Sequence, residues 1–181
     1  MSLLKTENQI YADIIGFINQ ALSDLQISNW QVMQLKQPVK LTEIKPTIYI
    51  TIANKNRLGW QSRYYPSIDD NLKIKEKFKV ELDCQISALR RRNLSDTVNT
   101  IGSTDVLENL KAYLLNPNNI VKLRQLGYLI FQPSPIQSPD FIDDSDNFEF
   151  MPFFNVSFIL EQTLINAQTA IDDTTLKVER L

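Results

Sequence analysis

The chain has 181 residues, of which 19 are basic and 21 acidic, and its formal net charge at pH 7 is −2. That length and a hydrophobic share of 43% suit one soluble folded domain with a single core. The absence of histidine excludes imidazole general bases, triads that use imidazole, and zinc or iron sites with histidine ligands.

Cysteine use and hydropathy bear on the compartment. Cys84 is the only cysteine, so the chain forms no internal disulfide and no multi-thiolate metal site. This pattern favours a reducing cytosol. Apolar runs stay well short of the roughly 20 residues that a membrane span needs. The first residues lack the layout of a signal peptide. We therefore expect neither membrane insertion nor export by that route.

The first predicted element is a helix over about 7–24. Thr6 and Gln9 have the spacing of a capping box, in which each side chain binds the backbone of the other residue. Apolar residues then recur with the period of a helix, which predicts one buried stripe. Gly16 costs on the order of 1 kcal/mol relative to Ala in a helix. We therefore expect a neighbouring segment to pass close to it.

Short strands are predicted in the next part of the chain. One covers 30–36 and is ended by Pro38. A second covers 48–53 and looks central, because β-branched and aromatic residues occupy both of its faces. The polar residues Asn54–Asn56 are typical of a turn, and a partner strand is predicted over 58–65.

The strongest alternation in the chain runs from Lys73 to Ala88. Apolar residues occupy one face, interrupted only by Glu76, and polar residues occupy the other. At about 3.3 Å per residue this strand exceeds the usual strand length, so we expect one end to project as a hairpin arm. Cys84 lies on the apolar face, which favours a packed core thiol over a nucleophile.

A pair of helices follows. The first is predicted over about 104–115 with Ser103 or Thr104 as its cap. An Asn-Pro pair at 116–117 ends it and begins a short helix, which has Gly127 as its C-cap. The inward-facing residues of the short helix are predicted to be Ile120, Leu123 and Leu126.

The remainder of the chain is read as strands and loops. A brief strand over 128–132 is followed by a loop rich in proline and acidic residues, and another strand covers about 150–163. A polar connection then leads to a last strand over 175–181. Strand blocks separated by one pair of helices predict a single α+β domain over 1–181, with a largely antiparallel sheet and helices packed on one face.

Charge is unevenly spread along the chain. Residues 1–92 hold 14 basic and 9 acidic residues, whereas residues 93–181 hold 5 and 12. Opposite charges on the two halves are consistent with self-association, in which a basic face meets an acidic loop of the next copy. Two solvated faces of a monomer are the commoner reason for such a pattern.

Candidate interface residues fall in two groups. The segment 57–65 mixes arginine with aromatic residues, which suits a protein interface, sheet packing, or base stacking in a single-strand binder. The acidic net charge disfavours nucleic-acid binding. Lysines alternate along the long strand and either guard an exposed edge or attract anions. The candidates are Arg57, Trp60, Arg63, Tyr64, Tyr65, Lys75, Lys77 and Lys79.

Catalytic and metal-binding signatures are missing from the sequence. Its four scattered glycines form no phosphate loop. The pairs at 69–70 and 172–173 are turn-like carboxylates. The segment beginning Asp144-x-Asp146 starts like a calcium loop but lacks the later glycine and glutamate. We therefore expect no catalytic residue, no metal and no cofactor, and an enzyme is the least favoured class.

Several segments of the chain, taken in order, form a distinctive layout. They are the N-terminal helix, PTIYITI at 46–52 leading to Trp60, the lysine-alternating strand, YLLNP at 113–117, LGY at 126–128, the proline-rich acidic loop, and the aromatic strand over 150–160. In this layout the chain resembles the neck or tail terminator proteins of tailed bacteriophages. The resemblance covers nearly the whole chain.

The resemblance implies a structural virion protein, assembled in the host cytoplasm, that forms a hexameric ring. Such a ring caps the tail tube and joins it to the connector beneath the head. Its implied partners are other copies of the chain, the tube protein, the sheath, neck proteins, and genomic DNA that passes through the lumen without specific binding. Six copies at −2 each carry −12, and an acidic lumen lets DNA slide.

Two placements accompany this interpretation. The projecting end of the long strand is expected to reach a neighbour and close the ring by strand addition or sheet-edge contact. The acidic residues are expected at the lumen or at a subunit contact; they are Asp140, Asp143, Asp144, Asp146 and Glu149. The alternatives are another head-tail completion or baseplate protein and, from a different class, a small nucleic-acid-binding module.

Overall fold

The computed structural model describes residues 5–35, 45–64, 73–90, 97, 100–142 and 148–167. Its elements are α1 (Glu7–Asp24), β1 (Gln31–Gln34), β2 (Thr47–Tyr64), β3 (Lys73–Leu89), α2 (Ser103–Leu115), α3 (Pro117–Gln125), β4 (Tyr128–Ile130), β5 (Asp140–Ile142), β6 (Phe148–Phe150) and β7 (Phe153–Ala167). The strand predicted over 175–181 lies outside the described residues, as does the connection before it from residue 168 on.

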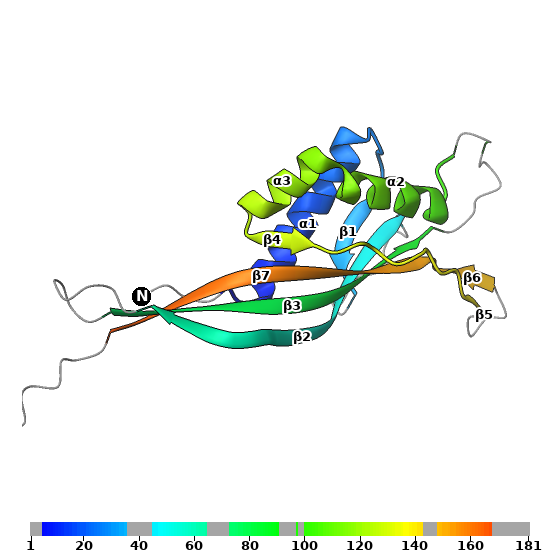
Figure 1. Ribbon diagram of the computed structural model, residues 1–181. Helices are drawn as coiled ribbons and strands as arrows, with labels where there is room; N and C mark the ends of the chain where they lie inside the picture. The colour runs from blue at the N-terminus through cyan, green and yellow to red at the C-terminus, as the bar shows by residue number, and fades with distance from the viewer. Residues whose placement is uncertain are drawn as a thin grey trace, which may run out of the picture.

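Five strands form one sheet in the order β1-β2-β3-β7-β4. β1 runs parallel to β2, and every other pair in this sheet is antiparallel. The three helices lie on one face of the sheet, the helix face (Figure 1). We call the opposite side the open face. This arrangement confirms the predicted α+β class, with a largely antiparallel sheet and helices on one side.

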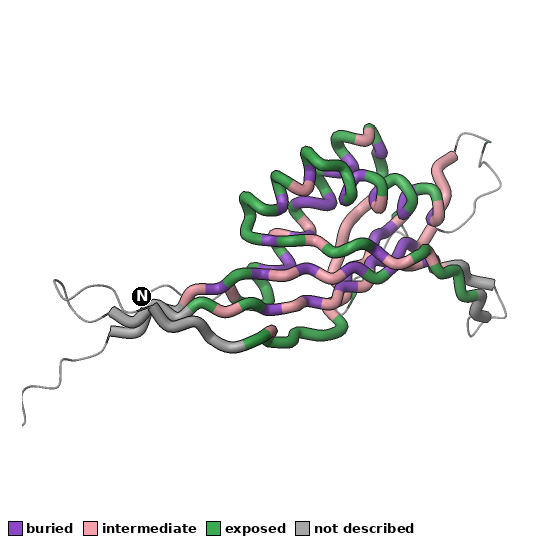
Figure 2. The backbone as a smooth tube through the Cα atoms, in the orientation of Figure 1, coloured by how far each residue is buried: buried purple, intermediate pink, exposed green. Residues whose placement is uncertain are grey.

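The core lies between the helices and the helix face of the sheet. Residues of β2, β3 and β7 alternate between buried and more accessible positions along each strand (Figure 2). Fully buried members include Ile10, Ile18, Ile48, Ile50, Leu82, Ile86, Leu107, Leu110, Phe154 and Phe158. Burial of each large apolar side chain contributes about 1.5–3 kcal/mol, so this layer holds the helices on the sheet.

Cys84 belongs to this core, as predicted. It is 1% exposed, and burial raises the pKa of its thiol to about 12. A thiol with so high a pKa is protonated at neutral pH and has little nucleophilic character.

The first helix has the predicted bounds and the predicted capping box. The Thr6 hydroxyl accepts from the Gln9 amide N–H at 3.3 Å, and the Gln9 side chain accepts from the Thr6 N–H at 2.8 Å. The expectation of a close neighbour at Gly16 is wrong. A Cβ added there would meet nothing within 4 Å, because this residue lies on the exposed side of α1.

The predicted cap of α2 is also wrong. Gly102 is the N-cap, and the Asp105 carboxylate accepts from its N–H at 2.8 Å. This bond uses a side chain three residues into the helix, so neither Ser103 nor Thr104 is needed as the cap.

The short helix α3 begins as predicted. The Asn116 side chain accepts from the Asn118 N–H at 3.0 Å, and Pro117 occupies the first position. The helix ends at its C-cap Leu126, one residue before the predicted Gly127. Leu126 is 43% exposed, so its predicted inward placement is wrong, whereas Leu123 is buried as expected.

The predicted turn at Asn54–Asn56 is wrong, because β2 continues without reversal from Thr47 to Tyr64. The register against β3 shifts between Ile52 and Asn54, and again between Leu58 and Ser62. β3 is long enough to pair with all of this segment, so the turn-favouring residues produce a bulge instead of a hairpin.

The strand bounds differ from prediction elsewhere. β4 ends at Ile130, and the edge continues as an irregular segment in which Phe131, Ser134 and Gln137 donate to carbonyls of β7. The region expected to be an acidic loop contains a separate hairpin of β5 and β6 around residues outside the description. β7 starts later and ends later than predicted.

Candidate protein interface

The three longest strands extend beyond the helices as a ribbon, which we call the arm (Figure 1). It consists of 57–64 of β2, 73–80 of β3 and 160–167 of β7. The arm confirms that the lysine-alternating strand projects from the body of the domain. It projects as the central strand of three.

The register of the arm brings distant parts of the sequence together. Leu58 and Glu161 flank Lys79, and further out Tyr64 and Ile165 flank Lys75. All the predicted interface residues except Tyr65, which lies outside the description, therefore fall on two adjacent strands of this ribbon. They are Arg57, Trp60, Arg63 and Tyr64 on β2, and Lys75, Lys77 and Lys79 on β3.

Arg57 has a defined role within the arm itself. Its guanidinium carbon lies 4.2 Å from the centre of the Phe78 ring. The bulge after Ile52 places Arg57 opposite Val80, and thus on the same face as Phe78. A cation over an aromatic face contributes about 0.5–1 kcal/mol at an exposed site. Arg57 therefore covers part of an apolar ring at the base of the arm.

The open face of the arm carries an exposed ion pair. The Lys77 ammonium lies 3.4 Å from a Glu161 carboxylate oxygen, and both side chains are about half exposed. An exposed pair of this kind contributes less than about 1 kcal/mol, so its effect on stability is small. Further along the same face, the Ser157 hydroxyl donates to Asp83 at 2.7 Å.

The two acidic candidates that the structure describes lie at the other end of the molecule. Asp140 is in β5 and Glu149 is in β6, and this small hairpin lies at the opposite end of the long strands from the arm (Figure 1). Asp143, Asp144 and Asp146 lie outside the described residues. Within one copy, Asp140 and Glu149 are therefore far from the candidates on the arm.

A groove that the sequence did not predict lies at the base of the arm. It has a volume of about 240 Å³ and lies between the start of α1 and the first bulge of β2. Glu7, Ile52 and Lys55 are among its lining residues. The bulge creates it, and the only sequence signal was the polar triplet interpreted as a turn.

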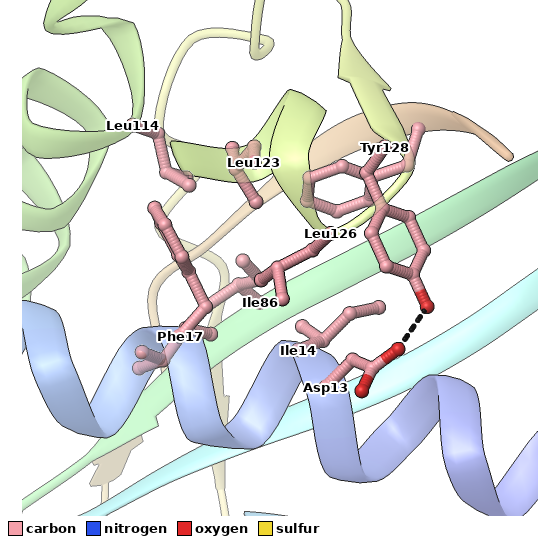
Figure 3. A pocket seen from close by; sticks show the side chains of 10 residues that line it. Asp13, Ile14, Phe17, Ile86, Leu114, Leu123, Leu126 and Tyr128 are labelled. Carbon is pink, nitrogen blue, oxygen red and sulfur yellow. Dashed lines mark hydrogen bonds between the residues drawn. The ribbon is translucent and has the colours of Figure 1, made fainter. Parts of the chain in front are cut away.

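A partly buried polar cluster joins α1 to β4. The Tyr128 hydroxyl donates to Asp13 at 2.8 Å (Figure 3). The Lys5 ammonium lies 2.7 Å from the same carboxylate oxygen. Burial and the Asp13 carboxylate raise the pKa of Tyr128 above its ordinary range. The adjoining apolar cavity is only about 10 Å³, at the lower limit for one water molecule. The cluster therefore has a structural role, which is to link α1 to β4.

A second set of polar contacts links α1 to the other two helices. The Tyr113 hydroxyl donates to Asp24 at 2.5 Å, and the Lys122 ammonium lies 3.7 Å from that carboxylate. Burial, followed by the hydrogen bond to Asp24, raises the pKa of Tyr113 to about 12. The same hydrogen bond is the main cause of the lowered pKa of Asp24. A phenol with so high a pKa is poorly matched to acid–base catalysis at neutral pH.

In the described part of the chain, His, Cys, Asp and Glu side chains form no group of three placed to hold a metal ion. Among the same residues, none of the helices combines the length and apolar character that crossing a membrane requires.

Comparison with families of known proteins gives a match over most of the chain. The sequence model of a family described as E217 gateway protein gp29 matches residues 9–171. The matched range contains every strand of the structure and all but the first residues of α1. No curated protein matches the chain.

Proposed function

Because the chain belongs to the E217 gateway protein gp29 family, a bacteriophage head–tail gateway family, we propose that it is a structural protein of the phage neck. In this proposal six copies form a ring that caps the tail tube and joins it to the head connector. The ring is assembled in the host cytoplasm and ends in the virion. The observation that carries the proposal is the family match, which spans 9–171.

The two ends of the molecule support a connecting role. The arm lies at one end, and the β5–β6 hairpin, with Asp140 and Glu149 on its strands, lies at the other (Figure 1). β2 contains Lys55, Arg57 and Arg63 and no acidic residue. A protein that joins two different assemblies needs two chemically different ends, because each end must select its own partner.

The charge of the chain supports passage of DNA without binding. A formal charge of −2 per copy makes a ring of six acidic as a whole. Non-specific DNA affinity depends mainly on basic residues that neutralise phosphates. We therefore propose that DNA moves through the lumen without sequence-specific contact.

We further propose that the protein is not an enzyme and needs no cofactor. Its buried thiol and the buried phenols of Tyr113 and Tyr128 have raised pKa values, so they stay protonated at neutral pH. Each of these groups also has a packing or tying role in the core.

The mass of the purified protein across a concentration series, with negative-stain images of any oligomer, tests the proposed ring. A six-fold ring with a central hole is the expected result, either alone or after addition of purified tail tubes. A monomer under both conditions would contradict the ring. Tight DNA binding that weakens steeply with salt would favour a nucleic-acid-binding module instead.

A further inference from the structure

The arm has two strand edges that no described strand covers. β1 pairs with β2 only as far as Ile50, and β4 pairs with β7 only as far as Leu160. Beyond those residues β2 and β7 pair on one side only, with β3. Unpaired strand edges expose backbone donors and acceptors and readily recruit another strand.

On β2, side chains supply hydrogen-bond partners for the outward N–H groups that follow the end of β1. The Ile52 N–H donates to the Tyr11 hydroxyl at 3.0 Å, which places this N–H on the outer edge just past β1. After the bulge, the Lys55 N–H donates to the Asn54 side chain at 3.0 Å. Alternation places the backbone N–H and C=O of Arg57 on the outer edge next, on the side away from β3. The open edge of β2 therefore begins at Arg57.

On β7 the outward positions can be identified from its bonds to the neighbouring segment. The carbonyls of Phe153, Asn155 and Ser157 accept hydrogen bonds from that segment. The N–H and C=O groups of odd-numbered residues of β7 therefore point away from β3. The pairing of β7 with β3 continues without a register shift to Ala167. Glu161 and Thr163 therefore also present their backbone groups at the outer edge.

Both open edges lie at the same level of the arm. The register places Leu58 of β2 and Glu161 of β7 on either side of Lys79. From there both edges run toward the tip. β2 and β7 are each antiparallel to β3, so they point in the same direction. Rotation about an axis along the arm would therefore set the open edge of β7 beside the open edge of β2 in the next copy.

We propose that β7 of one subunit pairs in parallel with β2 of the next around the ring, so that the arms close into one continuous β-barrel. This inference rests on the proposed hexamer. Three strands from each of six copies give 18 strands. At a spacing of about 4.8 Å and a tilt of about 40°, 18 strands close at a diameter of roughly 35 Å, which leaves an open channel.

The charges of the two edge strands are complementary. β2 carries Lys55, Arg57 and Arg63 and no acidic residue, whereas β7 carries Glu161 and no basic residue. Juxtaposition of these two strands places opposite charges next to each other, and juxtaposition of like strands does not. Charge therefore favours head-to-tail closure around a ring.

In this barrel the open face would line the channel, because the helices occupy the other face (Figure 1). On that side β3 and β7 carry residues of both signs of charge, among them Lys77, Lys79, Glu81, Asp83 and Glu161. The wall of the channel would therefore be polar.

Disulfide linkage tests this contact. The background is Cys84→Ala, which removes the native thiol. Leu58→Cys is combined in turn with Glu161→Cys, Thr163→Cys or Ile165→Cys. These three pairs sample three registers of β7 against β2 of the next copy, two residues apart. After mild oxidation, we expect at least one of these double variants to form a ladder of linked chains that ends at six. In the matched control, Arg57→Cys replaces Leu58→Cys. Residue 57 faces the opposite side of the sheet from the β7 positions, so the control should form no ladder.

Two results would overturn the barrel while leaving the ring intact. One is a six-fold ring, established by mass, in which none of the three pairs links neighbouring chains. The other is an intramolecular disulfide between Thr163→Cys and Glu179→Cys in a six-fold ring, which would show that the C-terminal segment of the same chain occupies the edge of β7. Absence of any oligomer, alone or with tail tubes, would instead overturn the proposed ring and the barrel with it.

A backbone variant provides a second test. Thr163→Pro removes one outward N–H but none of the hydrogen bonds to β3, because odd-numbered residues of β7 face the outer edge. We expect its mass to shift from six copies to one, whereas Thr163→Val, which keeps the N–H, should still form the ring. At concentrations low enough for both variants to be monomers, their melting temperatures should be close. A Thr163→Pro ring as stable as the Thr163→Val ring would contradict the parallel pairing.

Discussion

The Tyr11 hydroxyl accepts a hydrogen bond from the Ile52 amide N–H at 3.0 Å. Ile52 comes two residues after Ile50, the last residue of β2 that pairs with β1. Tyr11 is 5% exposed and lies in the buried stripe of α1. A helix side chain thereby supplies the partner that the short strand β1 does not reach. The contact ends the covered part of the β2 edge and links the helix layer to the base of the arm.

We expect Tyr11→Phe to destabilise the protein by about 1–2 kcal/mol, because it leaves a partly buried N–H without its partner. The melting temperature should fall by about 2–8 °C for a domain of this size. Thermal and urea unfolding measure the change. Tyr49→Phe is the control, because Tyr49 lies on the same strand but on the open face, away from α1. Equal effects of the two substitutions would contradict this role for Tyr11.

The Tyr113–Asp24 hydrogen bond predicts a dependence of stability on acid pH. The pKa of Asp24 is lowered from 3.8 in the folded protein, mainly by the hydrogen bond from Tyr113. A lowered folded pKa contributes stability that is fully present above the unfolded pKa and is lost as pH falls through the folded pKa. Tyr113→Phe should therefore flatten the decrease in melting temperature below about pH 4. If the melting temperature of Tyr113→Phe decreases as steeply in acid as that of the unsubstituted protein, this hydrogen bond is not the cause of the decrease.

The same pair predicts a loss of stability in alkali. The pKa of Tyr113 is raised from 10.0 to about 12 in the folded protein. Its contribution is fully present below pH 10 and is lost as pH rises from 10 to about 12. Tyr113→Phe should remove this part of the alkaline loss, while Tyr128 still contributes its own. Spectroscopic titration of the phenols, compared between the two proteins, assigns the transition.

Two glycines predict opposite effects of the same substitution. Gly16→Ala should stabilise the protein by about 0.5–1 kcal/mol, because this exposed helix site has room for a Cβ. Gly127→Ala should destabilise it by about 1–2 kcal/mol, because φ at Gly127 is +89° and L residues are strained there. Chemical denaturation compares them directly. The prediction is wrong if both changes have the same sign.

Replacement of Lys75, Lys77 and Lys79 together by glutamate should prevent ring formation. The three lysines lie on the central strand of the arm, and the change would shift the charge of each copy by −6 beside a strand that already contains Glu161. Mass measurement reports the assembly state. The matched control replaces the same three residues by arginine, which keeps the charge and should preserve the ring. Intact rings in the glutamate variant would remove these lysines from the interface.

The sequence by itself determined the class of the fold and most of its elements. Alternation identified β3, because a strand with one buried face must repeat every two residues. Local capping chemistry identified the start of α1 and of α3, because those hydrogen bonds join residues only two or three positions apart. It also identified Cys84 as a core thiol, since its neighbours on that face are apolar.

Tertiary structure decided the features that depend on a distant partner. Asn54–Asn56 have the local chemistry of a turn, but they form a bulge because β3 continues alongside them. Gly102 caps α2 through Asp105, although two better capping residues follow it. The arm's open edges depend on where β1 and β4 end, and on the pairing of β3 with strands far away in the chain. Local patterns carry no record of these long-range pairings, so only the folded sheet shows which edges remain available to a partner.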